Sequence, residues 1–167
     1  MNVLISVASK HGVTGEIGDI LAAVLGAAGI EVEERRPQDV VSVDPYDAVI
    51  LGSAVYTGRW LEPARAFGER LASELSTRPV WLFSSGPLGD PPIPVAEPPD
   101  ALALSERIGA REHRSLAGRL ERAELGFLER AITKAVRAPD GDFRDWVGIR
   151  SWAAEIASSL TKEKVAA

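Results

Sequence analysis

The sequence predicts a single α/β domain with a doubly wound, five-stranded parallel sheet in the order 2-1-3-4-5. Three observations predict this fold. Short, almost wholly apolar runs alternate with longer amphipathic stretches, a pattern typical of strands buried on both faces and joined by helices. The 167 residues are enough for one domain. The 46% hydrophobic and 26% charged residues are typical of a globular protein.

The expected elements alternate along the chain. The expected strands are Val3–Ala8, Ile30–Glu34, Tyr46–Ser53, Pro79–Ser84 and Ser115–Gly118, the last required mainly by the alternation itself. The expected helices are Thr14–Gly29, Trp60–Leu75, a short one capped by Asp100, Glu121–Val136 and Asp145–Leu160. Gly29 ends the first helix, because glycine is favoured just past a helix end. We expect a single domain, residues 1–160, followed by a frayed terminus, residues 161–167.

Composition excludes several classes of function. The formal net charge of −5 argues against nucleic-acid binding and allows at most peripheral contact with a membrane. The sequence has no cysteine, so disulfides, thiolate catalysis and cysteine-ligated metals are excluded. Its apolar runs fall short of the ~20 residues of a membrane-spanning helix, and its start indicates a strand, not a signal peptide. We expect a cytoplasmic protein.

The loop after the first expected strand is a candidate phosphate site. Its residues are Ser9, Lys10, His11, Gly12, Val13 and Thr14. They lie between a buried strand and a helix N-terminus, where unpaired N–H groups and the helix dipole favour an anion. Gly12 allows close backbone approach, and the hydroxyls of Ser9 and Thr14 can donate to phosphate. Thr14 also suits an N-cap, so helix capping alone is the alternative interpretation.

Glycine spacing in this loop decides which nucleotide it fits. Gly12, Gly15 and Gly18 are three residues apart, which is not G-x-G-x-x-G. The P-loop pattern of a Gly-Lys pair before Ser or Thr is also missing. The loop therefore fits a mononucleotide phosphate better than a dinucleotide or ATP. A response-regulator function would need an acidic cluster after the first strand, and the sequence has none there.

Two further loops follow strands that end at the same edge of the sheet, where ligands of such folds bind. The residues after the third strand are Ala54, Val55, Tyr56, Thr57 and Gly58. The residues at the end of the fourth strand and after it are Ser84, Ser85, Gly86 and Pro87. Tyr56 is the favoured stacking partner for a planar ring, with Trp60 as the alternative. The stretch up to Pro99 is long for a loop, and such loops are often functional.

No catalytic residue is predicted. His11 is interpreted as part of the phosphate loop, and His113 as a residue at a strand edge without a special role. Asp90, Glu97 and Asp100 are scattered and form no acid–base pair. With no triad and no clustered metal ligands, redox chemistry would have to come from a bound cofactor.

The phosphate loop is similar to that of flavodoxins, with His11 at a position where they usually have threonine. More specifically, nearly the whole chain resembles the flavodoxin-like, menaquinone-dependent protoporphyrinogen oxidases. The matching stretches are Ser9–Ile17, Tyr46–Gly58, Leu116–Leu120, Asp145–Trp146 and Ala154–Ile156.

This resemblance implies a flavodoxin-like fold and an FMN cofactor through whose ring reducing equivalents pass. It assigns the phosphate to Ser9–Thr14 and the ring to residues 54–58 and 84–87. In the oxidases the acceptor would be a quinone and the substrate a porphyrinogen. Two regions depart from them. Glutamates balance the basic residues of Arg119–Arg137, where aromatic residues are few, and the Pro-rich stretch Gly86–Pro99 has no match.

Two other functions fit the same residues. A flavodoxin proper would carry electrons to a redox partner protein without a substrate of its own, and its acidic charge would favour docking to basic partners. A cofactor-free protein of this fold would serve in protein interactions, through the loop Gly86–Pro99.

Overall fold

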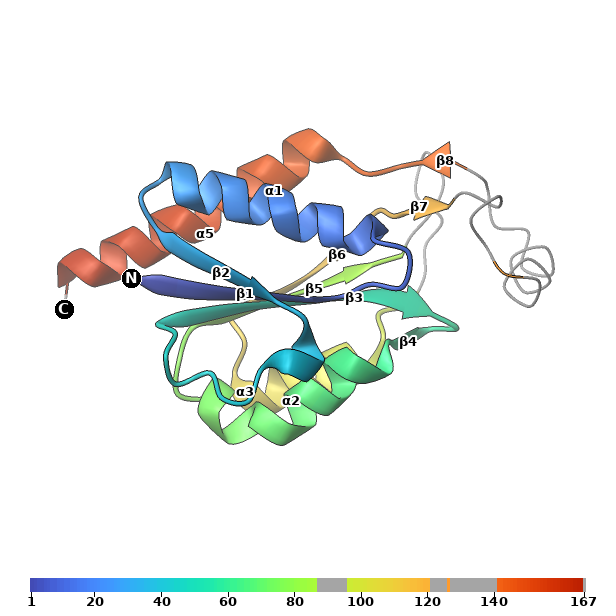
Figure 1. Ribbon diagram of the computed structural model, residues 1–167, viewed down its shortest axis with the longest axis horizontal. Helices are drawn as coiled ribbons and strands as arrows, with labels where there is room; N and C mark the ends of the chain where they lie inside the picture. Colours follow the sequence, from blue (N-terminus) through green and yellow to red (C-terminus); the bar gives the residue numbers. More distant parts are fainter. Residues whose placement is uncertain (87–95, 121–125, 127–140, 167) are drawn as a thin grey trace.

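The computed structural model describes residues 1–86, 96–120, 126 and 141–166, and its central feature is a parallel sheet (Figure 1). The strands lie side by side in the order β2 (Glu31–Arg35), β1 (Asn2–Ala8), β3 (Ala48–Tyr56), β5 (Val80–Ser85) and β6 (Glu112–Leu116). Counted as main strands, this is the order 2-1-3-4-5. The predicted doubly wound α/β fold is therefore confirmed.

Helices cover both faces of the sheet (Figure 1). One face carries α1 (Val13–Ala27) and α5 (Trp146–Ala166), and the other carries α2 (Glu62–Leu75), α3 (Pro99–Ile108) and the short 3-10 helix η1 (Pro37–Asp39). Each face has its own core, because successive strand residues point to opposite sides. Leu4 packs with Phe67 of α2, whereas Ile5 belongs to the core that contains Leu21 of α1 and Trp152 of α5.

Gly52 of β3 leaves space for an aromatic side chain of the neighbouring strand β5. It pairs with Phe83 across β3 and β5, and the Phe83 ring occupies the space where a side chain on Gly52 would lie. A Cβ on Gly52 would be 2.1 Å from Phe83 Cζ. Phe83 in turn meets Trp152 of α5 edge-on, with ring centroids 6.0 Å apart. The missing side chain of Gly52 therefore allows an aromatic pair to join the sheet to α5.

Gly29 ends α1, as the sequence predicts. Its φ of +79° is the left-handed conformation that favours glycine. The N–H of Gly29 donates to the carbonyl of Gly26 at 3.0 Å, and the N–H of Ile30 donates to that of Leu25 at 3.2 Å. These two bonds are those of a Schellman motif, which satisfies the last carbonyls of a helix.

Several boundaries differ from those expected. β3 continues to Tyr56 instead of ending at Ser53, because it folds back as a hairpin with β4 (Arg59–Trp60), and α2 therefore starts at Glu62. β6 covers Glu112–Leu116 rather than residues 115–118. α5 is helical through Ala166, so residues 161–166, expected to be frayed, continue the helix.

The region around the last expected helix is described only in part. β7 (Arg119–Leu120) pairs antiparallel with β8 (Gly141–Asp142), a short strand pair that the sequence does not predict. The expected helix Glu121–Val136 lies outside the described residues except for Gly126. The prediction that Asp100 caps α3 is wrong. The N-cap is Pro98, and Asp100 instead accepts hydrogen bonds from Arg59 and from the Trp60 backbone.

Candidate cofactor site

The three candidate loops come together at the carboxyl ends of β1, β3 and β5. This edge of the sheet lies at the right of Figure 1, beside the first turn of α1. β1 and β3 are neighbours in the sheet, and the order reverses between them. Such a switch point leaves a crevice beyond the strand ends, where doubly wound folds bind their ligands.

The first loop has an open helix N-terminus. α1 begins at Val13 with Gly12 as its N-cap, at φ +79°, and no side chain caps the first turn. The alternative interpretation, in which Thr14 is the N-cap, is therefore wrong, because Thr14 lies inside the helix and is buried. A Cβ added to Gly12 would meet nothing within 4 Å. The first backbone N–H groups of a helix have no partner within the helix, so this turn offers hydrogen-bond donors to an anion.

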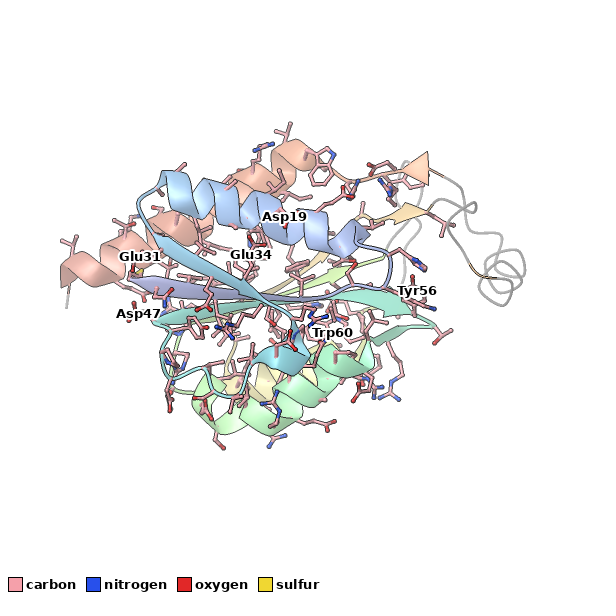
Figure 2. The ribbon with its side chains drawn as sticks, in the orientation of Figure 1. Asp19, Glu31, Glu34, Asp47, Tyr56 and Trp60 are labelled. Atoms are coloured by element: carbon pink, nitrogen blue, oxygen red, sulfur yellow. The ribbon has the colours of Figure 1, made fainter. Side chains whose placement is uncertain are left out.

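Lys10 and Tyr56 connect the first loop with the second. The Lys10 ammonium lies 5.7 Å from the centroid of the Tyr56 ring, within cation–π range. Figure 2 shows Tyr56 at the carboxyl end of β3, at the same edge as the phosphate loop. The predicted ring partner and a residue of the predicted phosphate loop therefore lie together. His11, the next residue of the first loop, is half-buried.

The second loop is a tight β-hairpin. Tyr56 pairs with Arg59 across two turn residues, Thr57 at φ +50° and Gly58 at φ +75°. Two consecutive positive φ values are typical of a type I′ hairpin turn. Thr57 and Gly58 are exposed, Tyr56 and Val55 are half-buried, and Ala54 is buried in the sheet. The hairpin holds Tyr56 and the turn at the edge of the crevice.

Ser84 lies beneath the third candidate loop, in a buried polar network. The indole Nε1–H of Trp60 donates to Ser84 Oγ at 2.7 Å, and the same oxygen lies 2.8 Å from His113 Nε2. The Ser84 and Trp60 side chains are buried, so Trp60 offers no exposed face for stacking (Figure 2). Ser85 is buried as well, Gly86 is half-buried, and Pro87 lies outside the described residues.

His113 belongs to this network, although the sequence predicts no special role for it. It lies on the edge strand β6 as expected, yet its side chain is only 5% exposed. Ser84 Oγ and His113 Nε2 share a hydrogen bond, and the imidazole tautomer decides which of the two atoms donates. Nδ1 faces Glu97 Oε2 at 3.7 Å. Burial lowers the pKa of His113, and the Glu97 carboxylate opposes this shift.

A buried arginine holds the first turn of α1, and the sequence gives no motif for it. The side chain of Arg144 is 2% exposed. It donates to Asp142 Oδ1 at 2.8 Å and Oδ2 at 2.6 Å, to Glu16 Oε2 at 2.8 Å and to the Val13 carbonyl at 3.0 Å. The guanidinium carbon also lies 4.3 Å from the centroid of the Trp146 ring. Only its place one residue before the Asp145–Trp146 pair, part of the resemblance, signals it in the sequence.

The site shows no metal-binding cluster in the described part of the chain, where no three histidine, aspartate or glutamate side chains gather. Among the described helices, none is both long enough and apolar enough to cross a bilayer. The chemistry that this edge supports is the binding of an anionic group at the start of α1, with a flat ring beside the hairpin.

Fold and site together define a doubly wound α/β domain with candidate ligand loops at the carboxyl ends of its central strands. Sequence comparison names the family: residues 4–146 match the flavodoxin domain family, and the chain belongs to it. No curated protein matches the sequence.

Solved structures agree on the fold. A flavodoxin from the domain Archaea is 12% identical with a TM-score of 0.67, over 96% of this chain and 99% of that one. Oxidised flavodoxin 1 from Bacillus cereus is 17% identical with a TM-score of 0.63, over 95% of this chain and 98% of that one. Rubredoxin oxygen:oxidoreductase from Desulfovibrio gigas is 16% identical with a TM-score of 0.68, and 99% of this chain aligns with only 37% of it. At these identities the likeness establishes the fold alone.

Proposed function

We propose that this chain binds FMN at the carboxyl ends of β1, β3 and β5 and transfers reducing equivalents through it. The observation that carries the proposal is the glycine-capped N-terminus of α1, open directly after the buried strand β1. Its N–H groups and helix dipole suit a phosphate. Membership of the flavodoxin domain family supports the same cofactor. FMN, when bound, supplies one- and two-electron transfer through its ring.

The proposed roles divide between two groups of residues. Residues Ser9–Thr14 hold the phosphate, with the Lys10 charge close by. Residues 54–58, and 84–86 with Pro87, border the ring, and Tyr56 stacks on it. The side chains of Ser84 and Ala54 are buried, so these two residues lie beneath the proposed ring position. The contact of Lys10 with Tyr56 supports a site in which phosphate loop and ring loop adjoin.

The decisive experiment is an absorption spectrum of the purified protein with and without added FMN, followed by titration with FMN and with riboflavin. Gly12→Val forces a β-branched residue into the left-handed region, which costs about 1–2 kcal/mol, so FMN affinity should fall about tenfold. Riboflavin, which lacks the phosphate, should bind equally well to both proteins.

Gly109→Val is the matched control. Gly109 also has a positive φ, +63°, and open space around its Cβ position, but it caps the far end of α3. This variant should lose stability and keep its FMN affinity. If the wild-type protein takes up no flavin, the proposal fails, and the cofactor-free interaction protein becomes the better interpretation.

A second candidate function is oxidation of protoporphyrinogen with a quinone as acceptor. Two stretches that resemble the oxidases, Leu116–Leu120 and Asp145–Trp146, lie together in the folded chain. The N–H of Phe143 donates to the Gly118 carbonyl, and Arg144 contacts Trp146. This shared location beside the start of α1 favours the candidate. Its alternative is a flavodoxin-type carrier that passes electrons to a basic redox protein, which the net charge of −5 favours.

An activity assay separates the two. The enzyme should convert protoporphyrinogen to a fluorescent porphyrin with menaquinone present, faster than protein without FMN does. The carrier should leave protoporphyrinogen unchanged and accept electrons in two separate one-electron stages on stepwise reduction. The redox partner protein, the quinone and a cytoplasmic location stay predictions.

A further inference from the structure

We propose that Arg144 is a positioning residue that makes the first turn of α1 selective for a phosphate-bearing flavin. This inference rests on the proposed FMN site and adds a residue from outside the three candidate loops. Arg144 follows β8 in the chain and is 131 residues from Val13, whose carbonyl it binds at 3.0 Å. The side chain therefore joins the last part of the domain to the first residue of α1.

Geometry is the first part of the argument. The guanidinium makes a bidentate contact with the Asp142 carboxylate. Asp142 lies in β8, opposite Arg119 of β7. The other end of the guanidinium holds Val13 and Glu16, the first and fourth residues of α1. Two-oxygen arginine–carboxylate contacts fix orientation as well as distance. The first turn, whose N–H groups would meet the proposed phosphate, is thus tied to the β7–β8 strand pair.

Charge is the second part. Glu16 lies in the first turn of α1, where its carboxylate interacts favourably with the helix dipole but repels an incoming phosphate. Arg144 Nη1 is 2.8 Å from Glu16 Oε2, and Arg119 Nη1 is 3.8 Å from Glu16 Oε1. Two arginines therefore balance Glu16 and Asp142 at this end of the helix. Loss of Arg144 would leave a half-buried carboxylate next to the phosphate position.

The test compares Arg144→Met with wild type in titrations of the apoprotein with FMN and riboflavin. Methionine keeps packing against Trp146 and removes the charge and its hydrogen bonds. Loss of these charged hydrogen bonds frees the first turn of α1, so FMN should bind about ten- to a hundredfold more weakly. Riboflavin affinity should change less than about twofold, because the variant alters only the phosphate end. Arg144→Lys keeps the charge but loses the planar guanidinium, so its FMN affinity should lie between those of wild type and Arg144→Met.

Glu16→Gln supplies the internal check. In the Arg144→Met background it should restore part of the lost FMN affinity, because it removes a carboxylate that Arg119, at 3.8 Å, compensates only in part. The double-mutant cycle isolates this coupling. Arg78→Met is the matched control for a lost anchor. Arg78 is 13% exposed and likewise binds backbone carbonyls, of Val43 and Tyr46, at the opposite end of the sheet. It should lower the melting temperature and leave FMN affinity unchanged.

The outcomes are separable. Equal losses for FMN and riboflavin, or no loss in Arg144→Met and Arg144→Lys, would overturn the role of Arg144. A wild-type protein that binds neither flavin would instead overturn the proposed FMN site. If Arg144→Met does not fold, Arg144→Lys and the Glu16→Gln single variant still decide the question, since both keep a charged arginine or lysine at the anchor.

Discussion

At the scale of single residues, two titratable groups have shifted pKa values with opposite consequences for stability. His113 is buried against Ser84 and Trp60, and burial lowers its pKa from the ordinary value of 6.5. Glu34 of β2 faces Asp19 of α1 (Figure 2), and burial followed by the charge of Asp19 raises its pKa from 4.5. The lowered pKa of His113 favours the folded protein at high pH, and the raised pKa of Glu34 favours it at low pH.

We expect His113→Phe to flatten the fall of stability on acidification. A base with a lowered folded pKa binds its proton more readily in the unfolded chain, so wild-type stability falls as pH drops below 6.5 toward the folded pKa. Melting temperatures measured from about pH 7.5 to pH 5.5 should decline less in the variant than in wild type. At the upper end the variant should be less stable, because Ser84 loses a hydrogen-bond partner worth about 1 kcal/mol. Parallel curves for the two proteins would contradict the buried, neutral imidazole.

Glu34→Gln should stabilise the protein at neutral pH. An acid with a raised folded pKa holds its proton more tightly in the folded state, so stability is lost as pH rises from 4.5 through the folded pKa. Both carboxylates are largely exposed, so the gain is of the order of half a kcal/mol, about 1–2 °C in melting temperature. The gain should vanish near about pH 4, where wild-type Glu34 is protonated. An equal gain at both pH values would point to a cause other than charge.

At the scale of elements, the pairing of β3 with β5 depends on the space above Gly52. Gly52→Ala would place a methyl group 2.1 Å from Phe83 Cζ and push the ring toward Trp152. Overpacking of this kind costs about 1–3 kcal/mol, to be measured by urea unfolding. Gly26→Ala in α1 is the control, because its added methyl meets nothing within 4 Å. That change should instead stabilise by about 0.5–1 kcal/mol through helix propensity.

The sequence predicts elements well where periodicity is strong. The apolar runs of β1, β3 and β5 and the helical spacing of α1 place these elements within a few residues, because their side chains pack on both faces of one sheet. It fails in two places. The Arg59–Trp60 strand follows a two-residue turn at Thr57 and Gly58 that apolar periodicity does not mark. β6 starts early because it pairs with β5 from Trp81 onward, and no local pattern encodes that distant partner.

The candidate site likewise has residues that the sequence predicts and residues that it does not. The phosphate loop and Tyr56 are evident from the sequence because they follow buried strands that must end at one edge. Arg144 and His113 are not evident, since each acts through residues more than 25 positions away. His113 meets Ser84 across 29 positions, and Arg144 meets Glu16 across 128. Only the folded chain brings such pairs together.

At the scale of the whole molecule, the proposed cofactor should act as a structural ligand. Any ligand that binds only the folded state stabilises it by mass action, by about 2.7 kcal/mol at a concentration a hundredfold above its dissociation constant. FMN should therefore raise the melting temperature by about 5–10 °C for a domain of this size. Riboflavin should raise it less at equal concentration, and AMP not at all. A rise of equal size with AMP would indicate a general nucleotide phosphate site.

The two chain ends lie at the end of the sheet opposite the candidate loops, at the left of Figure 1. A domain fused to Met1, or a linker attached to the end of α5, would therefore leave the β3–β4 hairpin and the start of α1 uncovered. Immobilised through either terminus, every molecule on an electrode would turn its proposed flavin edge away from the surface toward solution. Electrons would then reach the electrode slowly by direct contact and readily through a diffusing mediator.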